Sequence, residues 1–143
     1  MESRADKAME KYRSGYNCAQ AIACTYCDLV GLDEETAFRL AEGFGFGMGN
    51  ADGTCGALSA ACMLVGMKSS TANLEKPNSK KETYKLCSAM MGPFAEQNGS
   101  VLCKDLKGLE NGKIPGTVLR TCPDCVRDAA LLLEDVLEKL EEK

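Results

Sequence analysis

The sequence predicts an all-α, single-domain helical bundle spanning residues 1–143, with a glycine-rich loop between two of its helices. Three observations predict this fold class. Apolar residues recur at helical spacing along most of the chain. Capping residues, glycine or proline stand where helices would begin and end, and no run of residues alternates as a half-buried strand does. A chain of this length is the size of one ordinary domain and can bury a core of its own.

Capping signals place the individual helices. Gly15 ends the first expected helix. Asn17 is a good N-cap for the second helix, and Gly31 is its expected C-cap. Asp33 caps the third helix, and Pro123 suits the first turn of the last helix. The expected helices cover residues 3–13, 18–30, 34–43, 55–67, 79–97 and 123–140, with a kink or break favoured at Gly92-Pro93 and a short helical piece at Cys103. Residues 68–77 and 108–121, the latter with Gly112 and Pro115-Gly116, are expected to be connections.

The most unusual segment is residues 43–56, which contains six glycines in fourteen residues. Each glycine costs about 1 kcal/mol relative to alanine in a helix, so an ordinary helix is not expected here. The segment resembles a nucleotide-binding fingerprint, but that motif requires a preceding strand, and a helix precedes it here. A close backbone approach to a bulky inorganic group is the favoured explanation, and a tight helix–helix crossing is the alternative. The candidate cofactor-binding residues are Gly45, Gly47, Gly49 and Gly56.

The composition excludes several classes of function. The chain has no histidine, so it contains no Ser-His or Cys-His dyad, no histidine-ligated zinc, no Rieske centre and no C-x-x-C-H haem attachment. A net charge of -4 argues against a nucleic-acid or anionic-membrane partner. The charged N-terminal residues and the absence of a long apolar run predict no signal peptide and no membrane span, so a cytoplasmic location is expected.

Nine cysteines in a reducing compartment indicate metal binding or redox chemistry rather than a disulfide framework, since the number is odd. Four of them lie at or near predicted helix starts, where the helix dipole and free N–H groups favour a thiolate. If these four converge, they could hold zinc or an iron–sulfur cluster. The alternative is that each is a small buried apolar residue. The four candidate metal ligands are Cys18, Cys55, Cys103 and Cys122.

Two C-x-x-C pairs are also present. Cys122-Pro-Asp-Cys125 lies at a predicted helix start, which is the thioredoxin-type arrangement of a dithiol. Cys24-Thr-Tyr-Cys27 lies inside a predicted helix and is interpreted as part of the core or as support for a site. Cys62 and Cys87 are interpreted as packing residues.

Several segments together resemble one family. Residues 54–60, Thr-Cys-Gly-Ala-Leu-Ser-Ala, resemble the CGAxxG motif of the redox-active C_GCAxxG_C_C family, although Ala60 replaces the last glycine. Residues 15–21, 44–49, 103–106 and 122–130 resemble its other cysteine and glycine segments. The resemblance implies a small helical redox protein whose four characteristic cysteines are Cys18, Cys55, Cys103 and Cys122, with Cys125 as the competing choice for the fourth. The family is also similar to the iron-centre part of split-Soret cytochromes, which implies a [2Fe–2S] cluster.

The favoured hypothesis is therefore a cytoplasmic electron-transfer or redox-sensing protein with an iron–sulfur cluster on these four cysteines, acting with an unidentified redox partner protein. One alternative is a thiol–disulfide oxidoreductase that uses Cys122 and Cys125, or Cys55. Another is a structural zinc site with four cysteine ligands. A homodimer is compatible with the sequence but nothing in the hydrophobic pattern requires it.

Overall fold

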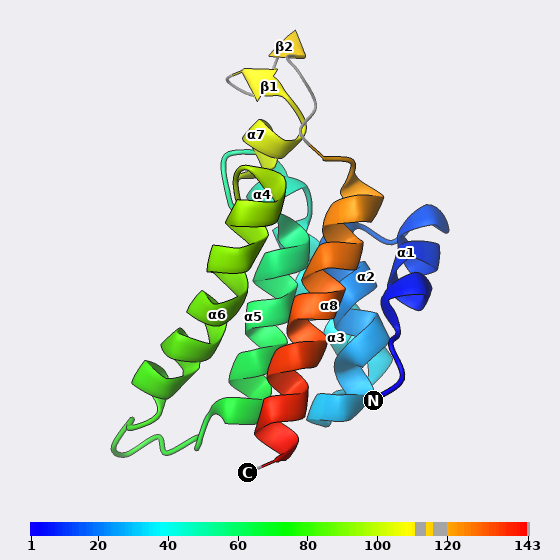
Figure 1. Ribbon diagram of the computed structural model, residues 1–143. Coiled ribbons are helices and arrows are strands. Elements are labelled where there is room, and N and C mark those ends of the chain that lie inside the picture. Colours follow the sequence, from blue (N-terminus) through cyan, green and yellow to red (C-terminus); the bar gives the residue numbers. More distant parts are fainter. Residues whose placement is uncertain (111–113, 116–119, 143) are drawn as a thin grey trace.

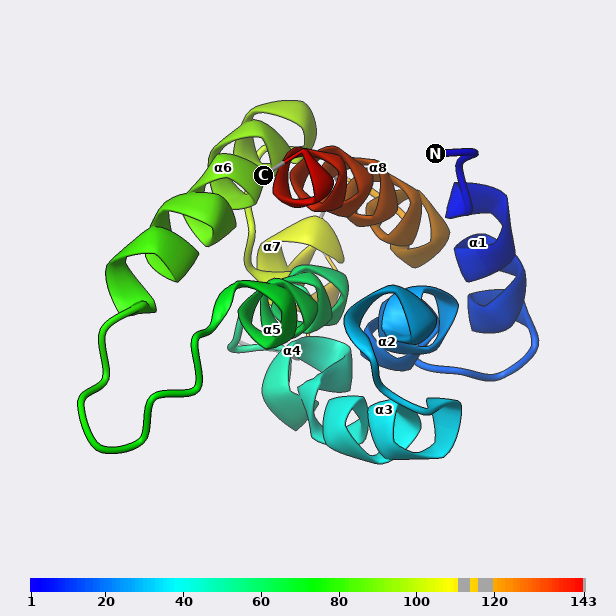
Figure 2. The same ribbon diagram turned by 90° about the horizontal axis from the view of Figure 1, so that it is seen from below.

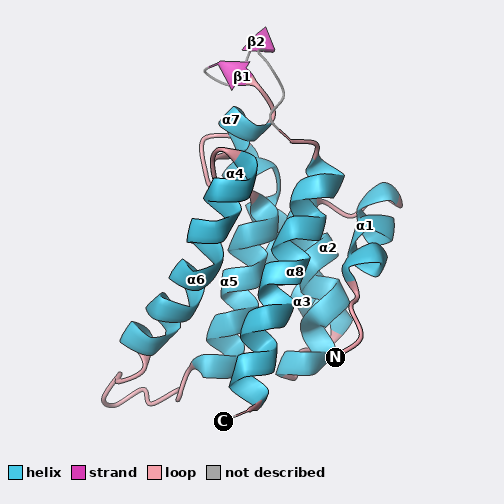
Figure 3. Ribbon diagram, viewed as in Figure 1, coloured by secondary structure: helices cyan, strands magenta, loops and turns pink. Residues whose placement is uncertain are grey.

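The computed structural model describes residues 1–110, 114–115 and 120–142, and helices form nearly all of its body (Figures 1 and 3). The elements in chain order are α1 (Ala5–Arg13), α2 (Cys18–Tyr26), the 3-10 helix η1 (Cys27–Val30), α3 (Glu34–Ala41), the 3-10 helix η2 (Glu42–Phe44), α4 (Gly45–Gly49), α5 (Gly56–Ser69), α6 (Lys80–Asn98), α7 (Cys103–Leu106), β1 (Leu109–Glu110), β2 (Ile114–Pro115) and α8 (Cys122–Glu141). The prediction of an all-α bundle is confirmed.

The predicted caps account for the helix boundaries. The Asn17 side chain accepts a hydrogen bond from the Gln20 N–H at 2.8 Å, and the Gln20 side chain accepts one from the Asn17 N–H at 3.0 Å, which forms a capping box at the start of α2. Gly31 follows η1 in the left-handed conformation that its C-cap position requires, with φ of 80°. Asp33 caps α3 through the Thr36 N–H.

The second helix is shorter than expected, and the helix that contains Gly92-Pro93 is not split there. α2 ends at Tyr26, and the expected last turn tightens into η1. α6 continues without a break through Gly92-Pro93. Pro93 leaves the Ala89 carbonyl without its helical N–H donor, but Ala89 is exposed, so water can satisfy that carbonyl.

A short antiparallel strand pair lies where only a loop was predicted. Leu109 lies opposite Pro115, and Glu110 lies opposite Ile114. Strands of two residues are too short to show the alternation from which strands are predicted. Gly112 and Gly116, which were also assigned to this loop, lie outside the described residues.

The direction of the helices decides where the site forms. α2, α5 and α8 begin at the same end of the bundle and run side by side, whereas α1 and α6 run in the opposite direction (Figures 1 and 2). α6 packs against α5 and α8, and α1 packs against α2 and α8. The N-termini of three long helices therefore meet at one end of the molecule.

The core of the bundle combines small and large side chains. Alanines such as Ala19 and Ala23 of α2 and Ala57 and Ala61 of α5 are fully buried and allow these two helices to pack closely. The largest fully buried side chains are Tyr26, Phe94, Ile22, Leu58, Leu64, Met90, Leu133, Val65 and Val126. In the part of the chain that the structure describes, no helix is both long enough and apolar enough to span a bilayer.

One buried carboxylate joins α8 to the N-terminal segment. The Glu134 side chain is only 6% exposed and accepts hydrogen bonds from the Tyr26 hydroxyl, the Ser3 hydroxyl and the Arg4 N–H. These donors satisfy an acid that would otherwise be costly to bury.

Candidate functional site: a thiol-lined cavity

The glycine-rich segment forms a left-handed turn at the end of the bundle where α2, α5 and α8 begin. Phe46, Gly47 and Met48 of α4 have φ values of 52°, 52° and 66°. The prediction that this segment is not an ordinary helix is confirmed. Left-handed conformations cost L-residues roughly 1–2 kcal/mol each, and such strain concentrates at functional sites.

Backbone hydrogen bonds hold this turn against the segment that contains α7. The Phe46 and Gly47 carbonyls accept hydrogen bonds from the N–H groups of Ala51 at 2.8 Å and Gly53 at 2.9 Å. The Gly53 carbonyl in turn accepts one from the Cys103 N–H at 3.0 Å. The Cys55 N–H donates to the Val101 carbonyl at 2.7 Å, so the two cysteine-bearing segments are fixed to one another.

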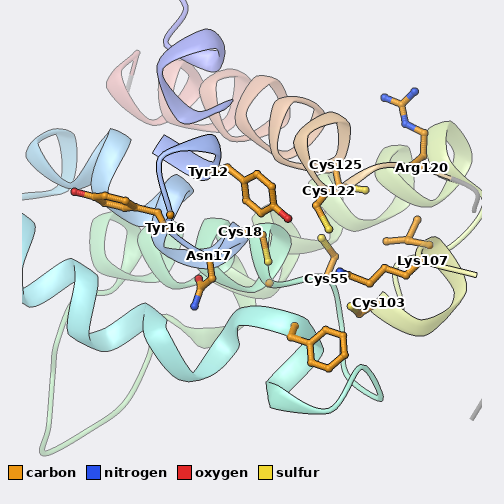
Figure 4. A pocket seen from close by; sticks show the side chains of 14 residues that line it. Tyr12, Tyr16, Asn17, Cys18, Cys55, Cys103, Lys107, Arg120, Cys122 and Cys125 are labelled. Atoms are coloured by element: carbon orange, nitrogen blue, oxygen red, sulfur yellow. The ribbon is translucent and has the colours of Figure 1, made fainter. Parts of the chain in front are cut away.

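Beneath these segments lies a cavity of about 360 Å³ that five cysteines line (Figure 4). The thiols come from four separate parts of the chain and are brought together only by the fold. The lining cysteines are Cys18, Cys55, Cys103, Cys122 and Cys125, and the other lining residues are Tyr12, Gly15, Tyr16, Asn17, Phe46, Gly56, Leu106, Lys107 and Arg120.

The four candidate ligands lie where the sequence placed them relative to the helices. Cys18, Cys103 and Cys122 are the first residues of α2, α7 and α8, and Cys55 is the N-cap of α5. All four line the cavity, as does Cys125. Cys122 and Cys125 therefore both remain available as the fourth ligand.

The thiols interact directly with one another. A hydrogen bond with the Cys55 thiol raises the pKa of Cys18 above its usual range, and burial adds to this effect. The pKa of Cys55 rises to about 12, chiefly through its hydrogen bond with Cys125. Cys18, Cys55 and Cys125 thus form a continuous row of thiols along the cavity.

Helix starts were expected to lower the thiol pKa values, and here other effects outweigh that contribution. The N–H groups of Phe46 and Ala19 hydrogen-bond the Cys18 sulfur and lower its pKa, but the Cys55 thiol and burial raise it more. Burial likewise raises the pKa of Cys103 to about 11. Cys18 and Cys103 therefore remain protonated at neutral pH when no metal is bound.

A cation and a phenol both contact the Cys122 thiol within the cavity (Figure 4). The Lys107 ammonium hydrogen-bonds this thiol and also lies 5.3 Å from the centroid of the Phe46 ring. The Tyr12 hydroxyl hydrogen-bonds Cys122 from α1, and burial together with this contact raises the pKa of Tyr12. Lys107 therefore supplies a positive charge beside the Cys122 thiol, and Tyr12 supplies a neutral hydroxyl group beside the same thiol.

Arg120 also lines the cavity, just before α8 begins. Its guanidinium forms an ion pair with Asp128 at 2.8 Å, while its Nε–H is buried and has no hydrogen-bond partner among the described residues. Arg120, Lys107 and Tyr12 were not identified from the sequence as site residues. Tyr12 fits the apolar stripe of α1, but Lys107 lies four residues after Cys103, a spacing that places both on one face of a helical turn.

The candidate glycines have different roles. A Cβ on Gly56 would lie 2.6 Å from the Cys18 sulfur, and one on Gly47 would lie 2.5 Å from Cys103 Cβ. A Cβ on Gly45 would meet the Asn17 side chain at 2.4 Å. Gly49 has φ of 85°, and a Cβ there would have no described atom within 4 Å, so Gly49 serves the turn rather than a close contact. Of these four glycines, only Gly56 lines the cavity itself.

The remaining cysteines lie elsewhere. The Cys24 thiol donates to the Glu34 carbonyl at 3.7 Å, and the Cys27 thiol donates to the Cys24 carbonyl at 3.5 Å, so this C-x-x-C pair belongs to the packing of α2, η1 and α3. Cys62 and Cys87 face each other between α5 and α6. All nine cysteines are free thiols.

Among the described residues, no three cysteine, aspartate or glutamate side chains are grouped so that they could hold a single metal ion. The five thiols surround a volume instead of converging on a point.

The described residues thus form a helical bundle in which five free thiols line one cavity. The chain belongs to the family described as "Putative redox-active protein (C_GCAxxG_C_C)", whose model matches residues 16–136. No curated protein and no solved structure gave a significant match to the chain.

Proposed function

We propose that this redox-active protein carries an iron–sulfur cluster, of the [2Fe–2S] type, in the thiol-lined cavity and serves in electron transfer or redox sensing in the cytoplasm. The observation that carries the proposal is the convergence of five cysteine thiols from four segments on one cavity of about 360 Å³. Thiolates are the usual ligands of such clusters. The proposed ligands are Cys18, Cys55, Cys103 and Cys122.

The charges around the cavity also suit a cluster held by thiolates, which is anionic. The N-termini of α2, α5 and α8 point their positive dipole ends toward this end of the bundle. Lys107 adds a full positive charge beside Cys122 and Cys103. These groups would offset the cost of removing the thiol protons, which burial otherwise disfavours.

The chain's own residues have distinct tasks in this proposal. Gly56 and Gly47 leave room for the side chains of Cys18 and Cys103, and the Phe46 N–H donates to Cys18. Lys107 and Tyr12 orient Cys122. A bound cluster would supply one-electron transfer, and the exposed Phe46 side chain places an apolar surface at the cavity where a redox partner protein could approach.

Anaerobic reconstitution with iron and sulfide tests the proposal. We expect a brown protein with visible absorption and matching amounts of iron and acid-labile sulfide. Cys55→Ser should lose this absorption, whereas Cys24→Ser, which changes a thiol outside the cavity, should retain it. A colourless protein without iron after reconstitution would overturn the proposal, and tight binding of zinc alone would support the structural zinc alternative.

The same experiment identifies the fourth ligand. Cys122→Ser should abolish the cluster absorption and Cys125→Ser should preserve it, because Lys107 places its positive charge beside the Cys122 thiol and would stabilise Cys122 as a thiolate. The reverse result would assign Cys125.

A second candidate function is thiol–disulfide exchange by the metal-free protein. The observation that favours it is that Cys122, which is less buried than the other cavity cysteines, has Lys107 beside it and Cys125 one helical turn away. Turnover of a small disulfide substrate by metal-free protein, lost in Cys122→Ser, would support this candidate.

We expect no nucleic-acid or membrane partner for this protein. Light scattering would test whether it forms a homodimer.

A further inference from the structure

A second pair of thiols lies between α5 and α6, outside the cavity. The Cys62 thiol of α5 and the Cys87 thiol of α6 hydrogen-bond each other. Neither residue lines the thiol cavity. The sequence suggested only packing roles for them, because their pairing depends on how the two helices are aligned.

The contacts between the two helices fix that alignment. The hydroxyls of Ser69 and Thr83 are 2.9 Å apart, and a Cβ on Gly66 would lie 4.0 Å from Cγ2 of Thr83. Cys62 precedes Gly66 by one helical turn, and Cys87 follows Thr83 by one turn. Because α5 and α6 run in opposite directions (Figure 1), Cys62 and Cys87 occupy facing positions one turn beyond the contact between Gly66 and Thr83.

This pair is also more accessible than the other pair outside the cavity. Cys62 and Cys87 are half-buried, whereas Cys24 and Cys27 are buried and donate their S–H groups to backbone carbonyls. A small oxidant can therefore reach Cys62 and Cys87 in the folded protein.

We propose that Cys62 and Cys87 form a reversible disulfide, a second redox site that links α5 to α6. The co-reactant is a small disulfide of the glutathione type. Cys87 gives up its proton and attacks one sulfur of that disulfide as a thiolate, which releases the other half as a thiolate. The Cys62 sulfur then attacks the mixed disulfide and releases the second half, and the protons that Cys87 and Cys62 gave up convert the two released thiolates to thiols. One S–S bond forms between the helices, one breaks, and the two electrons reduce the small disulfide to two thiols.

The order of the two attacks follows from burial. Burial, together with the neighbouring Cys87, raises the pKa of the Cys62 thiol to about 12, so Cys62 stays protonated at neutral pH. Cys87 therefore attacks first and Cys62 resolves the mixed disulfide.

The link would fix α5, which begins at the cavity, to α6. α5 begins directly after Cys55, and α6 leads into Val101, whose carbonyl already accepts the Cys55 N–H at 2.7 Å. A Cys62–Cys87 bond would join the same two helices about two turns below this contact. It requires no cluster, so it does not depend on the function proposed above.

The test exposes the reduced full-length protein to glutathione disulfide, blocks free thiols with an alkylating agent under denaturing conditions, and cleaves the chain after methionine. The fragment 68–90 contains Cys87 as its only cysteine, and the fragment 49–63 contains Cys55 and Cys62. We expect these two fragments to be recovered as one disulfide-linked species that a reductant separates. The linked protein should also melt at a higher temperature than the reduced protein.

Two variants make the result specific. In Cys62→Ser the link should disappear and Cys87 should retain one glutathione, whereas Cys24→Ser should form the link as the unaltered chain does. Recovery of fragment 68–90 with Cys87 alkylated in the unaltered protein would overturn the proposal. A link that persists in Cys62→Ser would also overturn it, since Cys55 would then be the partner.

Discussion

Gly56 lies directly against the sulfur of Cys18: a Cβ at position 56 would be 2.6 Å from Cys18 Sγ and 2.6 Å from the Phe44 carbonyl oxygen. The first contact involves a cavity thiol and the second a backbone atom, so neither can move away without disturbing the site. The glycine of the CGAxxG-like motif is thus explained by the approach of a cysteine that is distant in sequence.

Gly56→Ala should therefore disrupt the cavity. We expect a lower free energy of unfolding and the loss of cluster absorption after reconstitution, measured by urea unfolding and visible spectroscopy. Gly43→Ala is the matched control, because a Cβ on Gly43 would meet no atom of the described part of the chain within 4 Å. Normal reconstitution of Gly56→Ala would show that the contact with Cys18 does not shape the site.

Gly47 and Gly49 should respond differently to substitution by alanine, although both have positive φ values of 52° and 85°. Gly49→Ala adds only backbone strain and should cost about 1 kcal/mol of stability without changing the cavity. Gly47→Ala also pushes a Cβ to 2.5 Å from Cys103 Cβ, so it should cost more and alter the reactivity of Cys103. Unfolding curves and the alkylation rate of Cys103 distinguish Gly47→Ala from Gly49→Ala. Equal changes in stability and in alkylation rate for both variants would contradict the different roles given to Gly47 and Gly49.

Lys107→Met should shift the reduction potential of a reconstituted cluster to a more negative value. The substitution removes a positive charge beside Cys122 and Cys103, and the oxidised, less negative form of a cluster is then favoured. A redox titration measures the shift. Lys104→Met on the same short helix is the control, since Lys104 does not line the cavity; an identical shift in both variants would remove the special role of Lys107.

Tyr26→Phe should lower the free energy of unfolding by about 1–3 kcal/mol, because it leaves the buried Glu134 carboxylate without one of its donors. Urea unfolding measures the change. Tyr84→Phe, at a side chain that is 63% exposed, should have little effect. If Tyr26→Phe and Tyr84→Phe had the same free energy of unfolding, the Tyr26–Glu134 hydrogen bond would contribute nothing to the stability of the folded protein.

Stability should fall as the pH rises above about 8.5, the usual thiol pKa in an unfolded chain. Burial, followed by Glu34 and Cys27, raises the pKa of Cys24 to about 11 in the folded protein. Between these values the unfolded chain loses the Cys24 proton while the folded chain keeps it, so the stabilising effect is complete below about 8.5 and is lost toward pH 11. Urea unfolding at a pH of about 7 and of about 10 checks the direction, and Cys24→Ser should show a smaller decrease; a rise in stability would contradict it.

Local signals in the sequence were sufficient for most of the helices. The Asn17 and Asp33 side chains accept hydrogen bonds from N–H groups three residues further along the chain, and Gly31 ends the helical segment directly before it. The structure shows each of these residues in its predicted role. The two-residue strands were missed because their pairing leaves no periodic pattern. The helix expected over residues 79–97 is present as α6, and it is not split at Gly92-Pro93, where the carbonyl that Pro93 leaves without a donor lies on the exposed side of the helix.

The sequence by itself determined that the protein is helical, that four cysteines stand at helix starts, and that the glycine-rich segment departs from ordinary helix, since each depends on interactions between near neighbours in the chain. Only the tertiary structure decided that α2, α5 and α8 begin at the same end, that Cys125 joins the other four cysteines, and that Lys107 and Tyr12 contact Cys122. The physical reason is that helix direction and alignment follow from long-range packing, which brings together thiols that no local pattern relates.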